Sequence, residues 1–422
     1  MKLKRSLALA LVTLTAFSGT LHADNKYSGA HKKHNGHRVQ LGPRPFYLVE
    51  GMEEGPLKQA LRQCEKGPFF TTDFSIGHRG AALQFPEHSD LSYRAGARMG
   101  AGIVECDVTF TQDGELVCRH SECDLATTTN IVTTPLNDLC TVPWTGPANE
   151  GYPEPVCCTS DLSVDQFKSL AAKMDARNKD ATTPEDYLGG TANWRTDLYT
   201  GRANVVTFEE SIALNQAMGV KHTPELKGAT HQNRVNAIFG SQQGYAQKFI
   251  DTLREAGVDP RDVFAQSFNK DDVLYWIEQN PEFGEQAVYL DSIDPTANPP
   301  VPGLGMAELK ELKAKGINIF APPMWALLAV NNAGEVIPSK YAKDIRAAGL
   351  DIITWTFERS DLREGASNAG WYYMFDPEGK AIKNDSDMYK ALDVLANDVK
   401  ILGIFSDWPA TVTYYANCMG LK

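Results

Sequence analysis

The stretch FSIGHRGAALQFPEHS (residues 74–89), followed by GAGIVECDVTFTQDGELVCRH (residues 100–120), contains the first repeating unit of this 422-residue chain. One apolar run ends at His78, a segment with helical spacing follows, and a second apolar run carries Glu105 and Asp107. Side chains alternate between the two faces of a strand, so these two carboxylates project to the same side. Two adjacent carboxylates repel each other unless a cation lies between them. The stretch therefore predicts a strand–helix–strand unit that carries a metal-binding carboxylate pair.

The alternation of short β-rich runs with helical segments continues to the end of the chain. The apolar runs fall at residues 74–78, 102–110, 220–227, 262–268, 286–291, 317–322, 350–357 and 401–407. The segments between them carry apolar residues at helical spacing, and several of these segments end in glycine. Strands that alternate with helices form parallel sheets, and eight such units are typical of an α/β fold, the TIM (β/α)8 barrel.

One connection departs from this pattern. Asp113-Gly114 is a strong hairpin-turn signal, so residues 115–120 are expected to run back antiparallel to the second strand. Residues 121–205 are rich in Thr, Pro and Cys, show little periodicity, and are too long for an ordinary loop. We therefore expect the barrel domain, residues 74–422, to contain a β-hairpin extension and a Cys-rich insertion subdomain after strand 2, which leans over the barrel mouth.

The eight cysteines all follow the N-terminal segment, a pattern that fits an oxidising compartment. The four in the insertion are the expected disulfide partners, and their pairing is left open: Cys123, Cys140, Cys157 and Cys158. Cys106 lies between two functional carboxylates on an inner strand. It is expected to face the surrounding helices as a small buried hydrophobe.

The N-terminal segment has the features of a secretory signal peptide. In residues 1–23, basic residues precede the apolar run LALALVTLTAF, and a small residue follows at a plausible cleavage point. The mature protein is therefore expected to be exported, either to the periplasm or out of the cell. Residues 24–73 form a polar flank whose amphipathic part, residues 57–62, is expected to pack on the outside of the barrel. No later stretch is long and apolar enough to predict a membrane helix.

The composition is acidic, with 41 basic and 53 acidic residues and a formal net charge of −12. Nucleic-acid phosphates are bound mainly by Lys and Arg, so the composition argues against a nucleic-acid partner. An anionic small-molecule substrate would have to be held locally, by a cation or by a few basic groups. The oligomeric state is not predicted.

Polar side chains gather at or near the C-terminal ends of the predicted strands, where barrels of this type place their active sites. They are His78, Glu105, Asp107, Glu225, Lys227 and Gln266. Three carboxylates without an inward cysteine or clustered histidines make an all-oxygen site, which favours Ca²⁺ or Mg²⁺. Zinc with histidine ligands is the alternative, but both His78 and His120 suit proton transfer better.

The motifs HRG, PEH, ECDVTFTQDG, CRH, PELK, QSF and GIFSDWP, in this order between Gly77 and Pro409, resemble the glycerophosphodiester phosphodiesterase family. The resemblance implies a TIM-type barrel that hydrolyses glycerophosphodiesters to glycerol 3-phosphate and an alcohol with a divalent cation. It implies roles for seven residues: His78 and His120 as the acid–base pair, Glu105, Asp107 and Glu225 as metal ligands, and Arg79 and Lys227 as phosphate contacts.

The resemblance does not assign a role to the remaining candidate residues. Gln266 and Trp355 are expected to line the substrate pocket, although a core position suits Trp355 almost equally. Glu87 is either a further residue of the metal shell or a helix N-terminal carboxylate. His88 stands where the family usually carries Asn and is left unassigned. The sequence WTFE (residues 355–358) replaces the family's usual WTVN. Because Glu358 differs from the family's residue, the family's leaving-group pocket is not assigned to this chain.

Two aromatic stretches bear on the size of the substrate: PPMWALL (residues 322–328) and WYYMF (residues 371–375). An exposed apolar rim there would favour transient lipid contact and a phospholipase D of the sphingomyelinase type, which acts on intact lipids through a cyclic phosphate. Packing of these residues against the insertion is the favoured interpretation and fits a small substrate. A non-catalytic glycerophosphodiester-binding protein is a further alternative, but binding alone needs no acid–base pair.

Overall fold

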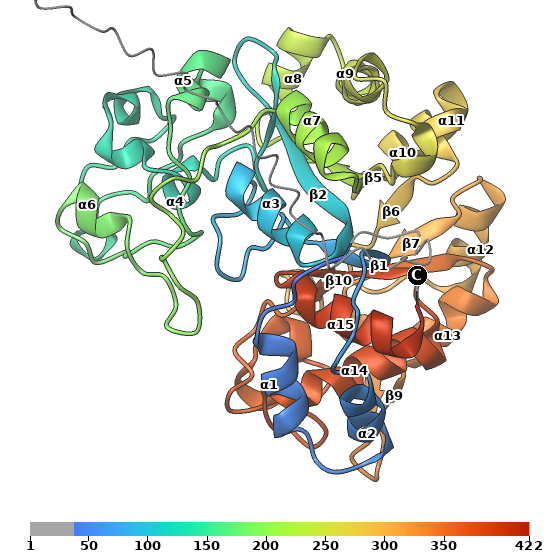
Figure 1. Cartoon of the computed structure of the whole chain (residues 1–422). Coiled ribbons are helices and arrows are strands. Elements are labelled where there is room, and N and C mark those ends of the chain that lie inside the picture. Colours follow the sequence, from blue (N-terminus) through green and yellow to red (C-terminus); the bar gives the residue numbers. More distant parts are fainter. Residues whose placement is uncertain (1–37, 422) are drawn as a thin grey trace, which may run out of the picture. The chain divides into compact units, whose positions relative to one another are not determined.

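The computed structural model describes residues 38–421; the expected signal peptide lies outside the described residues. In the described part, eight parallel strands close into a barrel, because β1 pairs with both β11 and β2 (Figure 1). These strands are β1 (Thr72–Gly77), β2 (Ala101–Phe110), β4 (Lys221–Leu226), β5 (Gln266–Ser267), β6 (Val288–Leu290), β7 (Ile319–Ala321), β10 (Asp351–Phe357) and β11 (Gly403–Ser406). Each falls on one of the eight predicted runs, so the predicted (β/α)8 barrel is confirmed.

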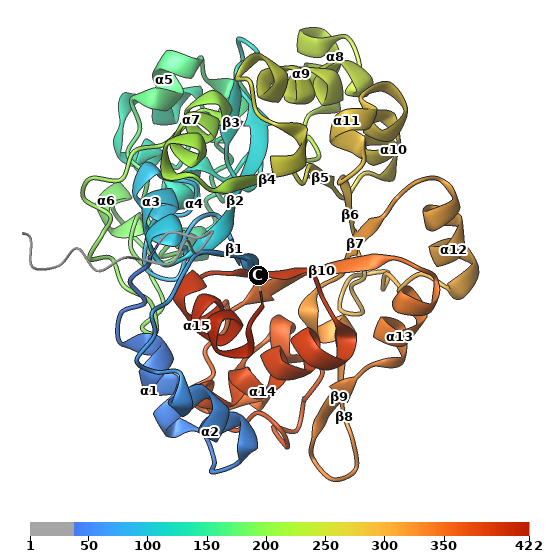
Figure 2. The same cartoon turned by 45° about the vertical axis from the view of Figure 1, so that its right-hand side comes forward.

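Helices follow the strands and surround them, as Figure 2 shows. They are α3 (Asp90–Arg98), α7 (Phe208–Met218), α8 (Gln232–Phe239), α9 (Gln242–Glu255), α10 (Lys270–Gln279), α11 (Pro281–Gly284), α12 (Met306–Ala314), α13 (Lys340–Ala347), α14 (Met388–Asp393) and α15 (Pro409–Met419). A π-helical turn over Val394–Val399 extends α14. A small antiparallel hairpin, β8 (Leu328–Val330) and β9 (Val336–Pro338), lies between β7 and α13 and was not predicted.

Two apolar layers hold the barrel together. Inside it, buried side chains from several strands meet, among them Ile76, Ile103 and Phe405. Between the strands and the helices lies a larger layer, to which β2 contributes Val104 and other residues of the opposite face. The alternation of strand side chains thus places Glu105 and Asp107 on the inner face with Ile103, as the sequence pattern predicts.

The predicted hairpin is present, and it is covalently closed. Strand β3 (Leu116–Cys118) pairs antiparallel with β2, with Val108 opposite Cys118. Cys106 faces the strand–helix layer as expected, but it is bonded to Cys118 rather than being a free buried thiol. That part of the prediction is wrong, because the hairpin register brings the two cysteines of neighbouring strands together. The bond ties the strand of the carboxylates to the strand that leads to His120.

The insertion after strand 2 is also present and is built from short helices. They include α4 (Leu125–Thr128), α5 (Val164–Lys168) and α6 (Pro184–Tyr187). Its apolar residues form their own core cluster, and the disulfides Cys123–Cys158 and Cys140–Cys157 cross-link it. The predicted set of disulfide-forming cysteines is therefore confirmed. Arg195 attaches the insertion to the barrel by donating to the main-chain oxygens of residues 82 and 83.

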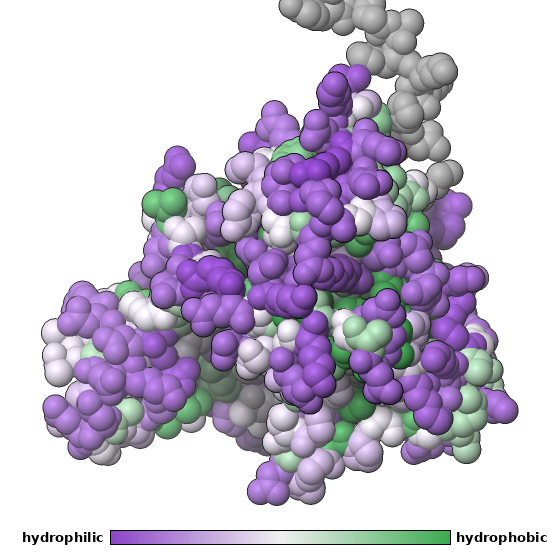
Figure 3. Space-filling model, turned by 90° about the horizontal axis from the view of Figure 1, so that it is seen from below, coloured by the Kyte–Doolittle hydropathy of each residue, from purple (hydrophilic) through white to green (hydrophobic). Residues whose placement is uncertain are grey.

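Before the barrel, residues 38–71 include two helices, α1 (Arg44–Gly51) and α2 (Pro56–Gln63), which pack on α15. A disulfide between Cys64 and Cys418 joins this segment to the end of that helix. Residues 38–421 contain no helix that is both long enough and apolar enough to cross a bilayer. Hydrophilic residues cover most of the face shown in Figure 3, and hydrophobic residues form scattered patches on it.

Gly80 follows the first strand at a position that requires glycine. Its φ is +94°, and a Cβ atom there would lie 2.5 Å from both the carbonyl carbon and the Oγ of Ser92 in α3. The close approach of this loop to α3 lets Ser92 Oγ donate to the main-chain oxygen of Arg79 at 2.8 Å and accept from the amide of Ala81. Gly80 therefore sets the position of Arg79 at the barrel mouth.

Gly80→Ala is expected to lower the free energy of unfolding by about 2–5 kcal/mol, because a strained backbone and a steric clash combine. Urea denaturation measures the change. Gly257→Ala is the matched control: Gly257 also has a positive φ (+66°), but no atom lies within 4 Å of its Cβ position. It should cost about 1–2 kcal/mol, the backbone part alone. Equal losses in the two variants would show that the clash at Gly80 is relieved without cost.

Candidate active site

A pocket opens at the C-terminal ends of the barrel strands, where the sequence predicts it. Its lining residues are His78, Arg79, Glu105, Asp107, His120, Glu225, Lys227, Gln266, Phe268, Leu290, Trp355, Tyr372 and Phe405. All the predicted site residues except Glu87 are among them. The fold thus brings together side chains from seven of the barrel strands and their loops, although they are spread over more than 300 residues of sequence.

The three predicted metal ligands meet in the centre of this pocket. The strand register places Asp107 beside Glu225 and places Glu225 beside Gln266 on the next strand. One carboxylate oxygen each from Glu105, Asp107 and Glu225 lies within 4.8 Å of the others. Two oxygens bound to one Ca²⁺ at about 2.3–2.6 Å can be about 5 Å apart, so these three carboxylates can share one cation.

The electrostatics of the three carboxylates also call for a cation. Burial and the neighbouring Asp107 raise the pKa of Glu105 well above its usual value. Burial raises the pKa of Glu225 to about 8, and Asp107 adds to the rise although Lys227 opposes it. Burial alone would also raise the pKa of Asp107, but Lys227 and His88 hold it well below the usual range. Without a cation the protein cannot easily keep all three ionised, and a bound divalent ion would remove this conflict.

Two basic side chains border the carboxylates. Arg79 donates from its amide to Glu105 Oε2 at 2.9 Å, and its guanidinium Nη1 contacts Glu87 Oε2 at 2.8 Å. Lys227 Nζ lies 2.7 Å from Glu225 Oε1 and 5.8 Å from the centre of the Phe268 ring. Both cations line the pocket, where an anionic group of a ligand would meet them.

His78 is held by a carboxylate that the sequence reasoning did not assign. Its Nδ1 lies 2.5 Å from Asp407 Oδ1, and its Nε2 lies 3.8 Å from Glu105 Oε2. Because an ionised carboxylate only accepts, the proton of the neutral ring is assigned to Nδ1, which leaves the Nε2 lone pair toward the pocket. Burial and the charge of Arg79 lower the pKa of His78 to about 4, against the opposing effect of Asp407.

His120 differs from His78 in its surroundings. It follows β3 at the pocket and is exposed to solvent. The pocket walls still displace water from the ring, and together with the cations Arg79 and Lys227 they lower its pKa well below the usual value. These shifts favour the neutral form of both histidines before a ligand enters, and a neutral imidazole can accept a proton.

Gln266 and Trp355 both line the pocket, as predicted. Gln266 is fully buried and donates from Nε2 to Glu105 Oε1 at 3.0 Å, while its Oε1 has no hydrogen-bond partner within residues 38–421. Trp355 donates from Nε1 to the main-chain oxygen of Ala321 at 2.8 Å and stacks on Trp371. Trp355 therefore serves both as pocket wall and as packing.

Glu87 lies behind the pocket rather than in it. It is buried and pairs with Arg79 and, at 2.9 Å, with Arg359 Nη2. Arg359 Nη1 contacts Asp407 at 3.1 Å, and its Nη2 contacts Asp175 of the insertion at 2.7 Å. Arg359 thus connects three carboxylates: Glu87, which pairs with Arg79, Asp407, which pairs with His78, and Asp175 of the insertion. Burial alone would raise the pKa of Glu87, but Arg79 and Arg359 hold it well below its usual value.

Glu358 does not line the pocket. Its buried carboxylate pairs with Arg44 Nε at 2.9 Å and accepts from Thr411 Oγ1 at 2.7 Å. The residue has a φ of +67°, and the chain then directs Arg359 toward the site. The departure WTFE therefore bears on the packing of α1 against the barrel, and Glu358 itself is not a wall of the leaving-group pocket.

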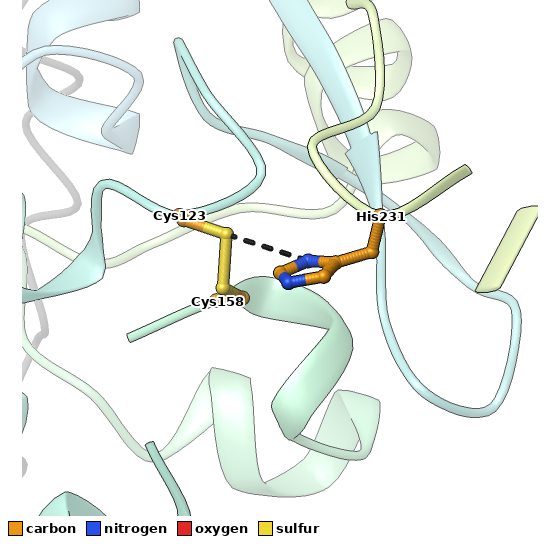
Figure 4. Close-up of side chains that lie close together, drawn as sticks. All are labelled: Cys123, Cys158 and His231. Carbon is orange, nitrogen blue, oxygen red and sulfur yellow. Dashed lines mark hydrogen bonds between the residues drawn. A yellow bond between two sulfur atoms is a disulfide. The ribbon is translucent and has the colours of Figure 1, made fainter. Parts of the chain in front are cut away.

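A second group of potential metal ligands lies outside the pocket and does not form a site (Figure 4). Cys123 and Cys158 are joined in a disulfide, so neither sulfur is a thiolate that could bind a metal. His231 Nδ1 lies 3.9 Å from the Cys123 sulfur and 3.1 Å from a carboxylate oxygen of Glu122. His231 thus links the loop after β4 to the insertion.

Comparison with known proteins identifies this arrangement. A profile of the glycerophosphoryl diester phosphodiesterase family matches residues 78–411, most of the chain. The chain belongs to this family. It is therefore an enzyme of the phosphodiester hydrolase class, and the predicted family membership is confirmed. The matched range starts at His78 and extends past Asp407, so it includes every residue that lines the pocket.

The chain is also similar to individual proteins and to a solved structure. A protein of Arthroderma benhamiae named as an extracellular protein is 38% identical over 249 residues, which are 59% of this chain and all of the relative. A glycerophosphodiester phosphodiesterase of Arabidopsis thaliana is 21% identical over 88% of this chain and 91% of its own length. A solved structure from Silicibacter pomeroyi, described as a candidate glycerophosphoryl diester phosphodiesterase, matches with a TM-score of 0.54 at 15% identity. That match covers 84% of this chain and 96% of the other, and it shows the shared barrel fold.

Proposed function

We propose that this phosphodiesterase is exported and depends on a divalent cation, and that it hydrolyses glycerophosphodiesters to glycerol 3-phosphate and an alcohol. The observation that carries the proposal is the joint position of two histidines and three buried carboxylates in one pocket. A phosphodiester is anionic and resists attack by a nucleophile, so its hydrolysis needs charge neutralisation and two proton transfers. The pocket contains residue types for both.

Glu105, Asp107 and Glu225 would hold the cation. The donor set fits because it offers only oxygen, and because buried carboxylates at this spacing conflict with one another without a positive ion. Oxygen ligands favour Ca²⁺ or Mg²⁺. When bound, the ion would neutralise charge on the phosphoryl oxygens and favour the charged transition state. Arg79 and Lys227, which flank the same carboxylates, would contact the remaining phosphate oxygens.

His78 and His120 would transfer the protons. Asp407 orients His78 so that Nε2 can take a proton from the attacking hydroxyl group, which supports His78 as the first base. His120, which is open to solvent, would take up a proton from water as the anionic substrate binds and would donate it to the leaving alkoxide. If the 2-hydroxyl of the glycerol attacks, the P–O bond to the alcohol breaks and a cyclic phosphate forms. Water would then open the cyclic phosphate with the two roles exchanged.

The aromatic stretches near the pocket favour a small substrate. Trp325 packs edge-on against Trp371 at 5.4 Å between ring centres, and Trp371 stacks on Trp355 at 5.6 Å. Met324 and Tyr373 are fully buried. Most residues of the two aromatic stretches are thus packed. They pack on one another, whereas the sequence analysis expected them to pack on the insertion.

The lipid-cleaving alternative keeps one supporting observation. A separate apolar groove is lined by Trp325 together with residues including Ile293, Leu328 and Phe375. An acyl chain could lie in such a groove, so a phospholipase D of the sphingomyelinase type is the second candidate. The third candidate, a non-catalytic binding protein, does not explain why two histidines face the carboxylates.

Export is supported by three observations. The chain begins with a segment of signal-peptide type, all eight cysteines form disulfides within residues 64–418, and a relative is named as an extracellular protein. Disulfides form and persist in oxidising compartments such as the periplasm or the extracellular space.

The deciding assay follows product release from glycerophosphocholine, lysophosphatidylcholine and sphingomyelin, each with Ca²⁺, with Mg²⁺ and with a chelator. Glycerol 3-phosphate should appear from glycerophosphocholine in the presence of a cation, with the lipids turned over more slowly. Preferred cleavage of a lipid, with a cyclic phosphate as the end product, would support the second candidate instead. A His120→Ala protein purified in parallel reports any contaminating phosphodiesterase.

A further inference from the structure

His88, which the sequence left unassigned, lies directly behind the carboxylate cluster. Its side chain is fully buried between Asp107 and Tyr93 and does not line the pocket. His88 Nε2 lies 2.8 Å from Asp107 Oδ2, and His88 Nδ1 lies 3.1 Å from the Tyr93 hydroxyl oxygen. Tyr93 is also fully buried, on helix α3. The ring is therefore held at both of its nitrogens.

The direction of these hydrogen bonds follows from the groups involved. Asp107 lies next to the guanidinium of Arg79, with 3.5 Å between Nε and Oδ2, and as a carboxylate it only accepts. His88 Nε2 is thus assigned as the donor to Asp107. In the neutral ring, Nδ1 is then an acceptor for the Tyr93 hydroxyl. The three side chains form a chain of hydrogen bonds from the helix to the cation site.

This arrangement divides the two oxygens of Asp107 between different tasks. Oδ2 is used by His88 and Arg79, whereas Oδ1 is buried and has no hydrogen-bond partner in the described chain. A buried carboxylate oxygen without a partner is costly unless a ligand satisfies it. Asp107 lies beside Glu105 and Glu225, so a cation shared by the three carboxylates would satisfy this oxygen.

The backbone around His88 is also held in place. His88 has a φ of +53°, a conformation that costs a residue with a side chain about 1–2 kcal/mol. Its amide donates to the main-chain oxygen of Arg79 at 3.2 Å. Arg119 Nη2 donates to the main-chain oxygens of Glu87 and His88 at 3.2 and 3.0 Å. An unfavourable conformation that several bonds maintain is typical of a functional position.

We propose that His88 is a positioning residue of the cation site, which fixes the Asp107 carboxylate through Oδ2 and leaves Oδ1 as the oxygen that binds the ion. The inference rests on the cation dependence proposed above and adds a residue that does not touch the ion. Hydrogen bonds to ligating groups orient them, and removing such a partner typically lowers metal affinity about 10–100-fold.

Isothermal titration of Ca²⁺ and Mg²⁺ into the metal-free full chain tests the proposal without an activity assay. His88→Phe keeps a buried ring and removes both nitrogens, and it should weaken cation binding about 10–100-fold. His88→Gln keeps an amide donor near the position of Nε2 and should retain most of the affinity. His222→Phe is the matched control, because His222 is another buried histidine that lies outside the pocket, and it should leave the affinity unchanged.

The outcomes separate this inference from the proposed function. A folded His88→Phe protein that binds the cation as tightly as the native protein overturns the role of His88. So does a His88→Gln protein that is no better than His88→Phe. If His88→Phe does not fold, Tyr93→Phe removes only the hydroxyl group and should still weaken binding; unchanged affinity there also overturns the proposal.

A native protein that binds neither ion would refute the cation dependence itself, whereas cation binding without glycerophosphodiester turnover would refute the proposed substrate alone.

Discussion

His120→Ala is expected to lower kcat by about 10²- to 10⁴-fold, the range for losing a general acid or base. The loss should fall on kcat more than on KM, because Arg79, Lys227 and the carboxylates that would bind the phosphate and the cation remain in place. His120 is exposed, so its removal should leave the free energy of unfolding nearly unchanged. Steady-state kinetics with glycerophosphocholine and a denaturant titration measure the two effects. A near-normal rate would refute the acid–base pair.

Added imidazole tests whether the lost activity is due to the missing imidazole ring. The space left by His120 is open to solvent, so imidazole should restore part of the rate of His120→Ala. His78→Ala should lose a similar factor but respond less, because His78 is buried and fixed by Asp407. His231→Ala is the matched control, since His231 lies outside the pocket beside a disulfide of the insertion, and its kcat should be unchanged. A similar loss in His231→Ala would show that the effect is not specific to the pocket.

Removal of the divalent cation is expected to lower kcat/KM by about 10²- to 10³-fold, which corresponds to several kcal/mol of transition-state stabilisation. Ca²⁺ or Mg²⁺ should restore activity after the chelator is removed. Because the cation would relieve repulsion among buried carboxylates, it should also stabilise the fold, by about 2.7 kcal/mol when present at one hundred times its Kd. Activity that resists chelation would refute the metal assignment.

Glu225→Gln separates binding from stability. The substitution keeps the shape of the side chain and resembles the protonated carboxyl group that a pKa of about 8 favours near pH 7 in the metal-free protein. Cation affinity should therefore fall, whereas the stability of the metal-free protein should change little. Glu311→Gln is the control, because Glu311 is an exposed residue of α12 that pairs with Lys315. It should change neither quantity. A Glu225→Gln protein that binds Ca²⁺ and Mg²⁺ with native affinity would exclude Glu225 as a ligand.

Much of the fold could be predicted because its signals are local. Each barrel strand is a short apolar run, and each is followed by a segment with helical periodicity, so the order of elements follows from neighbouring residues. The hairpin was also predicted, from Asp113-Gly114. Its disulfide was not, because the pairing of Cys106 with Cys118 depends on which residues of the two strands come to lie side by side.

Some residues of the candidate site could be predicted from the sequence, and others could not. His78 and Glu225 lie at strand ends, and Glu105 forms an alternating pair with Asp107 within β2, so all three could be chosen from the sequence. Asp407 also lies at a strand end, in the quoted motif GIFSDWP, and the same rule would have found it. Arg359 follows the end of β10 by two residues, so the strand-end rule would have pointed to it as well. Asp175 carried no such signal, since it comes from the insertion.

The amino-acid sequence by itself therefore determined the barrel, the family, and the charged residues and histidines that line the pocket, because periodicity and strand ends are properties of short segments. The tertiary structure alone decided which side chains form hydrogen bonds or ion pairs with these pocket residues from outside the pocket. It placed Asp407 behind His78, Arg359 between Glu87 and Asp407, and His88 behind Asp107. These partners depend on the register of strands and on loop conformations at positive φ. Both result from packing over the whole chain and leave no pattern in a short stretch of sequence.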